Sequence, residues 1–326
     1  MVYYLLVFKR SGGELMKKYG FGVDIGGTTC KIGFFETSGK LLDKWEIHTN
    51  TENNGASILN DVAESIAQKL EKDGISKEDV QGIGVGVPGP VKANGIVNRC
   101  VNLGWDVFNV ADSLTTKTGL PVKAGNDANV AALGEMWQGG GKGHKDVVMV
   151  TLGTGVGGGI IVDGKMISGA AGAGGEIGHI SVNDEEPEVC GCGKHGCLEQ
   201  YASATGIVRL ANRKLAAADG ESALRGLKKV TAKDVFDEAK AGDRLAIEIV
   251  EEVGAILGKA LANVCCVVDP EIIVIGGGVS KAGRILIDVI RKNFVAHAFH
   301  ACQNTEFALA TLGNDAGMYG CMNMIL

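Results

Sequence analysis

Residues 146–162, DVVMVTLGTGVGGGIIV, repeat a pattern that first occurs at residues 19–29, YGFGVDIGGTT. Each stretch begins with an apolar run typical of a buried strand and continues with a turn of glycine and threonine. A second extended run then returns as a hairpin, at residues 157–162 in one case and 31–35 in the other. Two such hairpins indicate a duplicated α/β domain and not a single doubly wound sheet.

The rest of the chain supplies helices and strands around these hairpins. Helices are predicted at residues 56–70, 128–137, 231–241, 244–265, from Ser280 and at 315–322, and further strands at residues 41–47, 80–87, 121–125, 271–275 and 307–311. The length of 326 residues exceeds what one hydrophobic core usually organises. We therefore expect two domains with a cleft between them, and a junction near residue 125.

Composition excludes several classes of protein. The net charge of −6 offers no basic face for nucleic acid. The apolar start MVYYLLVFKR carries its positive charge after the apolar run and lacks a cleavage site, so we expect neither a secretion signal nor a membrane span. Residues 1–18 are set apart as an extra segment, for which a misassigned start is one explanation. Nine cysteines, an odd number, suit a reducing cytoplasm.

The first motif is Asp24-Ile-Gly26-Gly27-Thr28. A carboxylate at a strand end can orient Mg²⁺ through its water ligands. The two glycines leave room for phosphate oxygens against backbone N–H groups, and Thr28 adds a hydroxyl donor. An ordinary β-turn explains the same residues, because Gly-Gly pairs are common in turns. Both interpretations remain open for this motif taken alone.

The second motif is the turn at residues 151–159, which has five glycines among its last seven residues. Each glycine weakens a plain strand by roughly 0.5–1 kcal/mol, so a simple hairpin would not favour them. With the first turn it predicts two phosphate clamps, one from each domain, and Thr154 and Gly155 are the candidate contacts here. A Rossmann arrangement is excluded, since the strand–GxGxxG–helix unit with a downstream acid is missing.

The third motif is Asn126-Asp127-Ala-Asn129. Asn126 can fix a substrate hydroxyl, and Asp127 can accept its proton during attack on a γ-phosphate. Asn and Asp are also favoured as helix N-caps, and the two roles are compatible.

The fourth motif joins Glu176-Ile-Gly178-His179 to Cys190-Gly-Cys192, Cys197 and Glu199. One histidine and three cysteines form the ligand set of a tetrahedral Zn²⁺, and four protein ligands leave no open position. The zinc is therefore predicted to be structural, which excludes a metallohydrolase. His195 is a competing ligand, but it lies in the turn between two cysteines, and we favour His179.

Glu176 and Glu199 flank the proposed zinc ligands. Two carboxylates held rigid in this way suit hydrogen bonding to vicinal sugar hydroxyls. The alternative is that each is a solvated surface glutamate, which is the commoner place for this residue.

Taken together, these motifs resemble the ROK family, and within it the bacterial glucokinases, over the chain from about Tyr19 to its end. The residues that carry the resemblance are Asp24-Ile-Gly-Gly-Thr28, Pro88-Gly89-Pro90, Asn126-Asp127-Ala-Asn129, Leu152-Gly-Thr-Gly-Val-Gly-Gly158, Glu176-Ile-Gly-His179 and Cys190-Gly-Cys192 through Cys197-Leu-Glu199.

The resemblance implies an actin-like, ribonuclease-H-type sugar kinase fold, in which two lobes close over sugar and ATP and one carries a structural zinc loop. The lobes would be residues 19–125 with about 308–326, and residues 126–307 with most sugar and adenosine contacts. It implies a homodimer or a tetramer.

The resemblance also assigns roles to single residues. It implies that Asp127 is the general base. The implied sugar ligands are Gly89, Asn126, Asp127, Glu176, His179 and Glu199, with His179 touching both zinc and sugar. Gly276 and Gly277 would contact adenosine, where small residues let a nucleotide approach a helix start.

We therefore expect transfer of the γ-phosphoryl group of ATP to the 6-hydroxyl of glucose, with Mg²⁺ required. The alternatives are a kinase for fructose, mannose or N-acetylmannosamine, and a sugar-sensing protein that has lost catalysis, against which the intact Asp127 argues. The family also includes repressors with a winged helix-turn-helix. Only 23 residues precede Asp24, too few for that module.

Overall fold

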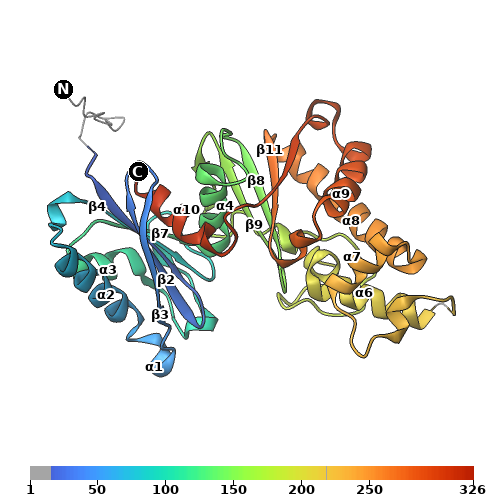
Figure 1. Cartoon of the computed structure of the whole chain (residues 1–326), viewed down its shortest axis with the longest axis horizontal. Coiled ribbons are helices and arrows are strands. Elements are labelled where there is room, and N and C mark those ends of the chain that lie inside the picture. The colour runs from blue at the N-terminus through green and yellow to red at the C-terminus, as the bar shows by residue number, and fades with distance from the viewer. Residues whose placement is uncertain (1–15, 218) are drawn as a thin grey trace. The chain divides into compact units, whose positions relative to one another are not determined.

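The computed structural model describes residues 16–217 and 219–326 (Figure 1). The chain forms two compact units. Unit 1 contains the chain up to Gln138, Met166–Gly174 and Asn314–Leu326, and unit 2 contains Gly139–Lys165 and Gly175–Gly313. The segment 1–18 that the sequence sets apart lies outside the described residues, except for its last three positions.

Unit 1 is built on a five-stranded sheet in the order β3-β2-β1-β4-β7. The strands are β1 (Tyr19–Ile25), β2 (Thr29–Glu36), β3 (Leu41–His48), β4 (Val80–Val87) and β7 (Val122–Asn126). The first three form an antiparallel meander, whereas β4 and β7 run parallel to β1. A small hairpin adds β5 (Ile96–Val97) and β6 (Phe108–Asn109).

Unit 2 repeats this topology with the order β10-β9-β8-β11-β12. Its strands are β8 (Val147–Leu152), β9 (Val156–Val162), β10 (Lys165–Met166), β11 (Ile272–Gly276) and β12 (Glu306–Leu309). Again the hairpin is antiparallel and the later strands are parallel to its first strand. The duplication predicted from the two glycine-rich hairpins is therefore confirmed.

Helices cover both sheets. In unit 1 they are α1 (Glu52–Gly55), α2 (Ile58–Asp73), α3 (Val110–Thr118), α4 (Asp127–Gln138) and α10 (Ala316–Met324). In unit 2 they are α5 (Glu199–Ala202), α6 (Ala204–Ala217), α7 (Ala232–Ala241), α8 (Arg244–Val268) and α9 (Arg284–His297). Single 3₁₀ turns lie at Lys77–Asp79, Val101–Leu103, Ile177–His179, Ala223–Gly226, Gly278–Ala282, His300–Cys302 and Gly313–Asp315. Within the described residues, none of these helices combines the length and the apolar character that crossing a membrane would take.

Helix ends follow glycines, as the sequence suggests, with one difference. Gly74 ends α2 in the left-handed conformation at φ 65°, which is typical of a glycine that caps a helix at its C-terminus. The sequence predicts that the last long helix of unit 2 starts at Ser280, but the helix starts at Arg284. Residues 278–282 form a 3₁₀ turn, and Gly283, at φ 78°, breaks the chain direction before α9 begins at Arg284. A side chain would be strained at that φ.

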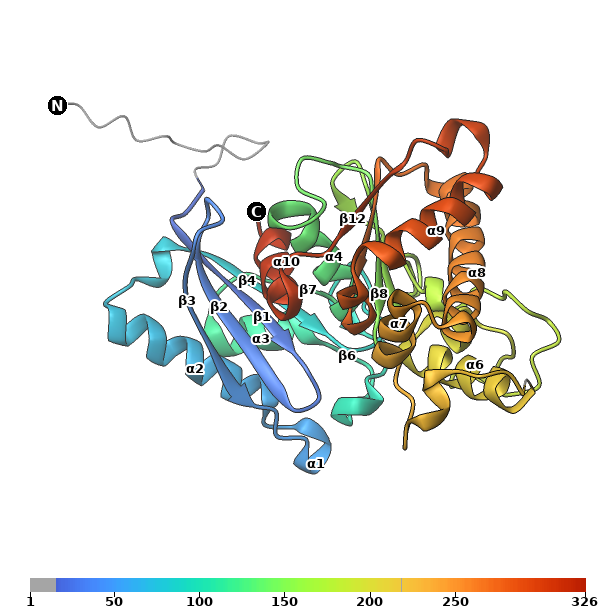
Figure 2. The ribbon, with the colours of Figure 1, turned by 45° about the vertical axis from the view of Figure 1, so that its right-hand side comes forward.

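Glycines on one face of the first sheet let α10 lie directly on the strands, and Figure 2 shows this helix beside β1. Because side chains alternate between the faces of a strand, Val23 joins the core with α2 and α3 whereas Gly22 faces α10. A Cβ atom at Gly22 would lie 1.9 Å from the carbonyl oxygen of Met318. One at Gly84 would lie 1.7 Å from that of Cys321. Neither position accepts a larger residue unless the helix moves.

The same kind of contact joins α10 to α4. A Cβ atom at Gly320 would lie 1.5 Å from the carbonyl oxygen of Val130, and one at Gly134 would lie 2.1 Å from that of Ala316. Because the two helices pack this closely, α4 belongs to unit 1 and the boundary between the units follows Gln138. The sequence placed that boundary near residue 125.

We predict that Gly84→Ala destabilises unit 1 by on the order of 3 kcal/mol, because the added methyl group meets backbone that cannot rotate away. Differential scanning calorimetry should show a lower unfolding temperature for this variant. Gly226→Ala is the matched control, since a Cβ atom there meets no described atom within 4 Å. Equal unfolding temperatures for Gly84→Ala and the unaltered chain would contradict the close packing of α10.

Candidate active site

The turn between β1 and β2 holds the first candidate phosphate contacts. The N–H of Gly26 donates to the carbonyl of Thr29 at 3.0 Å, and the hydroxyl of Thr49 donates to the carbonyl of Gly26 at 2.8 Å. Gly27 and Thr28 are exposed at the tip of this turn. A Cβ atom at Gly27 would meet no described atom within 4 Å, so the turn presents bare backbone to solvent.

Asp24 lies one residue before the end of β1, against the first turn of α10. A Cβ atom at Gly317 would lie 2.5 Å from its Oδ2, so only glycine leaves room for this carboxylate. Burial raises the pKa of Asp24 to about 6, the negative charge of Asp127 adds to this effect, and Lys31 opposes it. Asp24 is therefore held where its charged form is disfavoured.

Asp127 opens α4 directly after β7, and Asn126 is the last residue of that strand. The Asn126 side chain donates to the carbonyl of Gly89 and to Oδ1 of Asp127, both at 3.0 Å. The N–H of Ala128 donates to the same Oδ1 at 2.8 Å. Among the described residues these bonds all reach Oδ1, which leaves Oδ2 as the oxygen able to take a proton. Asn126 also accepts from the N–H of Asn129 at 3.1 Å, so the capping role is real.

The electrostatics of these two acids fit a divalent cation. The Asp127 side chain is accessible, but neighbouring protein atoms displace much of the water around its carboxyl group, and this desolvation raises its pKa. The hydrogen bonds from Ala128 and Asn126 oppose that effect. Two nearby carboxyl groups that both resist ionisation are stabilised as carboxylates by positive charge. Oxygen ligands of this kind are those that Mg²⁺ takes.

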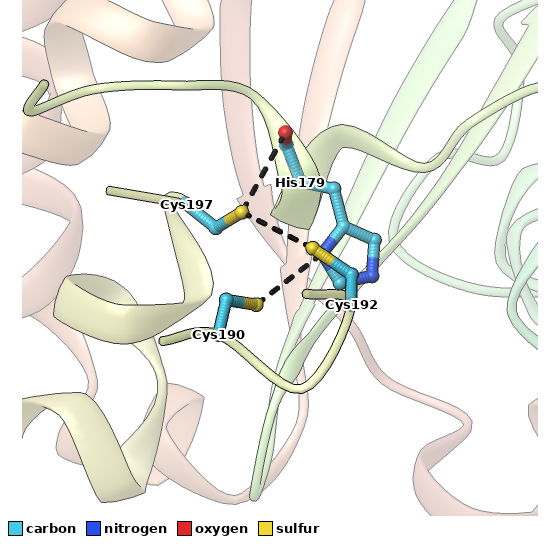
Figure 3. A group of neighbouring side chains, drawn as sticks. All are labelled: His179, Cys190, Cys192 and Cys197. Atoms are coloured by element: carbon cyan, nitrogen blue, oxygen red, sulfur yellow. Dashed lines mark hydrogen bonds between the residues drawn. The ribbon is translucent and has the colours of Figure 1, made fainter. Parts of the chain in front are cut away.

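The four predicted zinc ligands meet in unit 2 (Figure 3). Their ligand atoms all lie within 4.8 Å of one another. The Sγ atoms of Cys192 and Cys197 are 3.6 Å apart, and Nδ1 of His179 lies 3.8 Å from Sγ of Cys190. Zn–S bonds of about 2.3 Å give tetrahedron edges of about 3.8 Å, so these residues fit the metal. His195 lies outside the cluster, with its Nδ1 at 2.9 Å from the carbonyl of Glu186.

The thiols of this cluster differ in acidity. Burial raises the pKa of Cys190 to about 12 and also raises that of Cys197, whereas the N–H of Lys194 lowers that of Cys192. Three sulfurs this close repel one another once they are thiolates. A cation bound among them removes that repulsion and deprotonates the thiols, which is what a structural zinc does.

The two flanking glutamates lie around His179. Glu176 Oε2 is 3.9 Å from Nε2 of His179, and Glu199 Oε1 is 3.7 Å from its Nδ1. Glu199 Oε1 also accepts from the thiol of Cys190 at 2.9 Å. The structure therefore brings the predicted sugar ligands of unit 2 together at the edge of the cysteine cluster.

The second glycine-rich turn, a candidate phosphate contact, also packs closely against the segment that carries the cysteine cluster. A Cβ atom at Gly155 would lie 2.7 Å from Oε2 of Glu199, and one at Gly158 would lie 2.5 Å from the carbonyl oxygen of Gly175. These glycines let the segment that carries the cysteine cluster approach this turn and β9, a role that the sequence did not indicate. Gly153 stands open and Thr154 is exposed, so the turn still offers backbone and a hydroxyl to a ligand.

The strand β11 ends at Gly276 and Gly277 follows it, and the next residue, Gly278, lines a cavity of about 260 Å³. Gly277 is required by its φ of 82° and by the backbone of Leu152, from which a Cβ atom would lie 2.5 Å. The side chains lining the cavity were not singled out in the sequence. Those from α7 belong to an ordinary amphipathic helix, which gives no local signal of a site. They are Ala204, Ala232, Lys233, Phe236, Asp237, Val279, Lys281 and Ala282, with Gly278.

The chain is similar to known proteins over most of its length. The model of the ROK family matches residues 20–326. A glucokinase of Halalkalibacterium halodurans is 47% identical over 92% of this chain and 92% of its own, and one of Thermotoga maritima is 38% identical over 93% and 96%. The crystal structure of a Streptomyces griseus ROK family glucokinase in complex with glucose and AMPPNP has a TM-score of 0.72 and 34% identity, covering 94% of this chain and 98% of that one.

We predict about one equivalent of zinc per chain, because the Cys₃His set is complete. Elemental analysis after gel filtration checks this. Cys197→Ser should lose most of the metal, since the serine hydroxyl is a poor zinc ligand. Cys266→Ser is the control, because Cys266 is exposed and lies outside the cluster. A folded, unaltered chain that holds no zinc would refute the assignment.

Proposed function

The chain belongs to the ROK family, and from that premise we propose that it is a glucokinase, which transfers the γ-phosphoryl group of ATP to the 6-hydroxyl of glucose. The identity of 47% to a glucokinase over 92% of the chain supports this activity. The observation within the structure that carries it is Asp127, whose Oδ1 is fixed by two hydrogen bonds at the start of α4 while Oδ2 stays able to accept a proton.

Asp127 acts as the general base in this proposal. The 6-hydroxyl of glucose gives its proton to Oδ2 as its oxygen forms a bond to the γ-phosphorus. The bond from that phosphorus to the β–γ bridging oxygen breaks, and ADP leaves with the electron pair. The raised pKa of Asp127 makes it a stronger base than an ordinary carboxylate, although it must be ionised to act.

Phosphoryl transfer depends mainly on positioning and on neutralising charge. Asp24 is the residue proposed to hold Mg²⁺, which offsets the charge of the phosphates when bound. The exposed turns at Gly27 and Thr154 would contribute N–H groups and hydroxyls to the phosphates. The cavity next to Gly276 and Gly277 is proposed to take the adenine ring, because Phe236 supplies an apolar wall.

Sugar recognition is assigned to Gly89 and Asn126 in unit 1 and to Glu176, His179 and Glu199 in unit 2. Carboxylates accept bonds from sugar hydroxyls, and two carboxylates beside one imidazole can fix a pair of neighbouring hydroxyls. Zinc has a structural role in this proposal, since all four of its positions are filled by protein and none remains for substrate.

We also propose a cytoplasmic location and a homodimer or tetramer. In the described part of the chain all nine cysteines are free thiols, which suits a reducing compartment. The oligomeric state follows the family resemblance alone.

The specificity is tested by a coupled assay of ADP formation with MgATP and glucose, fructose, mannose or N-acetylmannosamine. We expect the highest kcat/KM with glucose. A higher value for one of the others would assign the chain to that sugar. Absence of turnover with every hexose, in zinc-replete protein, would favour a sugar-sensing protein and end the kinase proposal.

Asp127→Asn should lower kcat for glucose by about 10²–10⁴-fold, because the amide oxygen can still accept the N–H of Ala128 whereas the amide cannot take a proton. Steady-state kinetics with saturating ATP measure this. Asp79→Asn, at an exposed position in unit 1, is the control and should match the unaltered enzyme. Full turnover in Asp127→Asn would show that another group removes the proton.

A further inference from the structure

Glu186 is a buried acid that the proposed reaction does not use. It lies in the loop between His179 and Cys197, and only 3% of its surface is exposed. Acids are seldom buried without partners, because removal from water disfavours their charge. Its position in an otherwise exposed loop therefore calls for a physical reason.

Residues of α5 and α6 satisfy this carboxylate. Arg213 donates to both of its oxygens, at 3.0 and 2.7 Å, and the hydroxyl of Tyr201 donates at 2.5 Å. Arg209 approaches within 3.4 Å. These partners lower the pKa of Glu186 to about 2, with the hydrogen bonds of Arg213 as the largest cause. Glu186 is therefore ionised throughout the working range of pH. Bidentate hydrogen bonds from an arginine also fix the orientation of the carboxylate.

The same anchor continues into the chain on both sides of the cysteine cluster. The carbonyl of Glu186 meets Nδ1 of His195 at 2.9 Å, between Cys192 and Cys197. Beyond the cluster, the side chain of Gln200 accepts from the N–H of Cys197 at 3.0 Å and donates to the carbonyl of Glu188 at 2.9 Å. The two ends of the loop are thus tied together at its base.

Packing does not hold the tip of this loop. A Cβ atom at Gly191 or Gly193 would meet no described atom within 4 Å, and Cys192 is exposed. The metal cluster at its tip and the ionic anchor at its base therefore both restrain the loop, together with hydrogen bonds such as that from Nζ of Lys194 to the carbonyl of His179 at 2.8 Å.

We propose that Glu186 is a positioning residue, which ties the loop to α6 and so sets where Cys190 and Cys197 stand. Through Cys197 it also sets Glu199, which starts α5 two residues further along the chain. The step from Glu199 to sugar affinity rests on the proposed function, whereas the step from Glu186 to metal retention does not.

The test compares Glu186→Gln with Glu185→Gln in the full-length zinc-loaded protein. Glutamine keeps the size of Glu186 but loses the charge that two arginines bind, whereas the Glu185 side chain is exposed. Two quantities are measured: the rate of zinc release to a chromogenic chelator under native conditions, and the KM values for glucose and for ATP.

We expect Glu186→Gln to release zinc about tenfold faster and to raise the KM for glucose about tenfold, as residues that orient metal ligands do. The KM for ATP should stay close to that of the unaltered enzyme. A general loss of stability would instead weaken the binding of both substrates and raise both KM values. Glu185→Gln should match the unaltered enzyme in every measurement.

Arg213→Lys is the second variant, which keeps the positive charge but loses the two-pronged geometry, and it serves if Glu186→Gln does not fold. It should release zinc faster than the unaltered protein. Unchanged zinc release in the folded variants would overturn the inference. Faster release with an unchanged KM for glucose would overturn its sugar step. If the unaltered protein phosphorylates no hexose, the proposed function fails while the zinc measurement still decides the anchor.

Discussion

The candidate site of unit 2 depends on the meeting of one imidazole and three thiols within 4.8 Å. Glu199 starts α5 two residues after Cys197 of this cluster, and its Oε2 lies 2.7 Å from where a Cβ atom of Gly155 would be. The cluster thus lies where a glycine-rich turn, two acidic side chains and an exposed loop come together. Apolar packing could not supply it, because the loop tip buries little surface against the rest of the unit.

Unit 1 holds its acidic groups by a different means. Glycines bring the backbone of α10 onto β1 and β4 and against α4, and this packing leaves Asp24 a narrow space beside Gly317. Here close backbone packing, and not a cluster of candidate metal ligands, holds the side chains in place. The cost appears in the acidity of Asp24, whose pKa of about 6 reflects a carboxylate short of water. Perturbed acids of this kind gather where a protein works on a ligand.

The sequence predicted most of the architecture because alternating apolar residues and glycine turns are local signals. It also predicted that His179 and three cysteines would form one cluster, because their spacing is distinctive. It failed where a feature depends on residues distant in the chain. The contact of Gly155 with Glu199 has no local signature, and the partners of Glu186 lie up to 27 residues away. The break at Gly283 was missed because a lone glycine near a helix start is ambiguous.

Residues from both ends of the described chain build unit 1, and this bears on the order in which the protein forms during translation. Unit 2 ends at Gly313, so all of it has been synthesised before α10. Until that last helix emerges from the ribosome, the glycine face of β1 and β4 has nothing to cover it. The amino-terminal unit should therefore mature after the unit that follows it in the chain, which reverses the usual vectorial order.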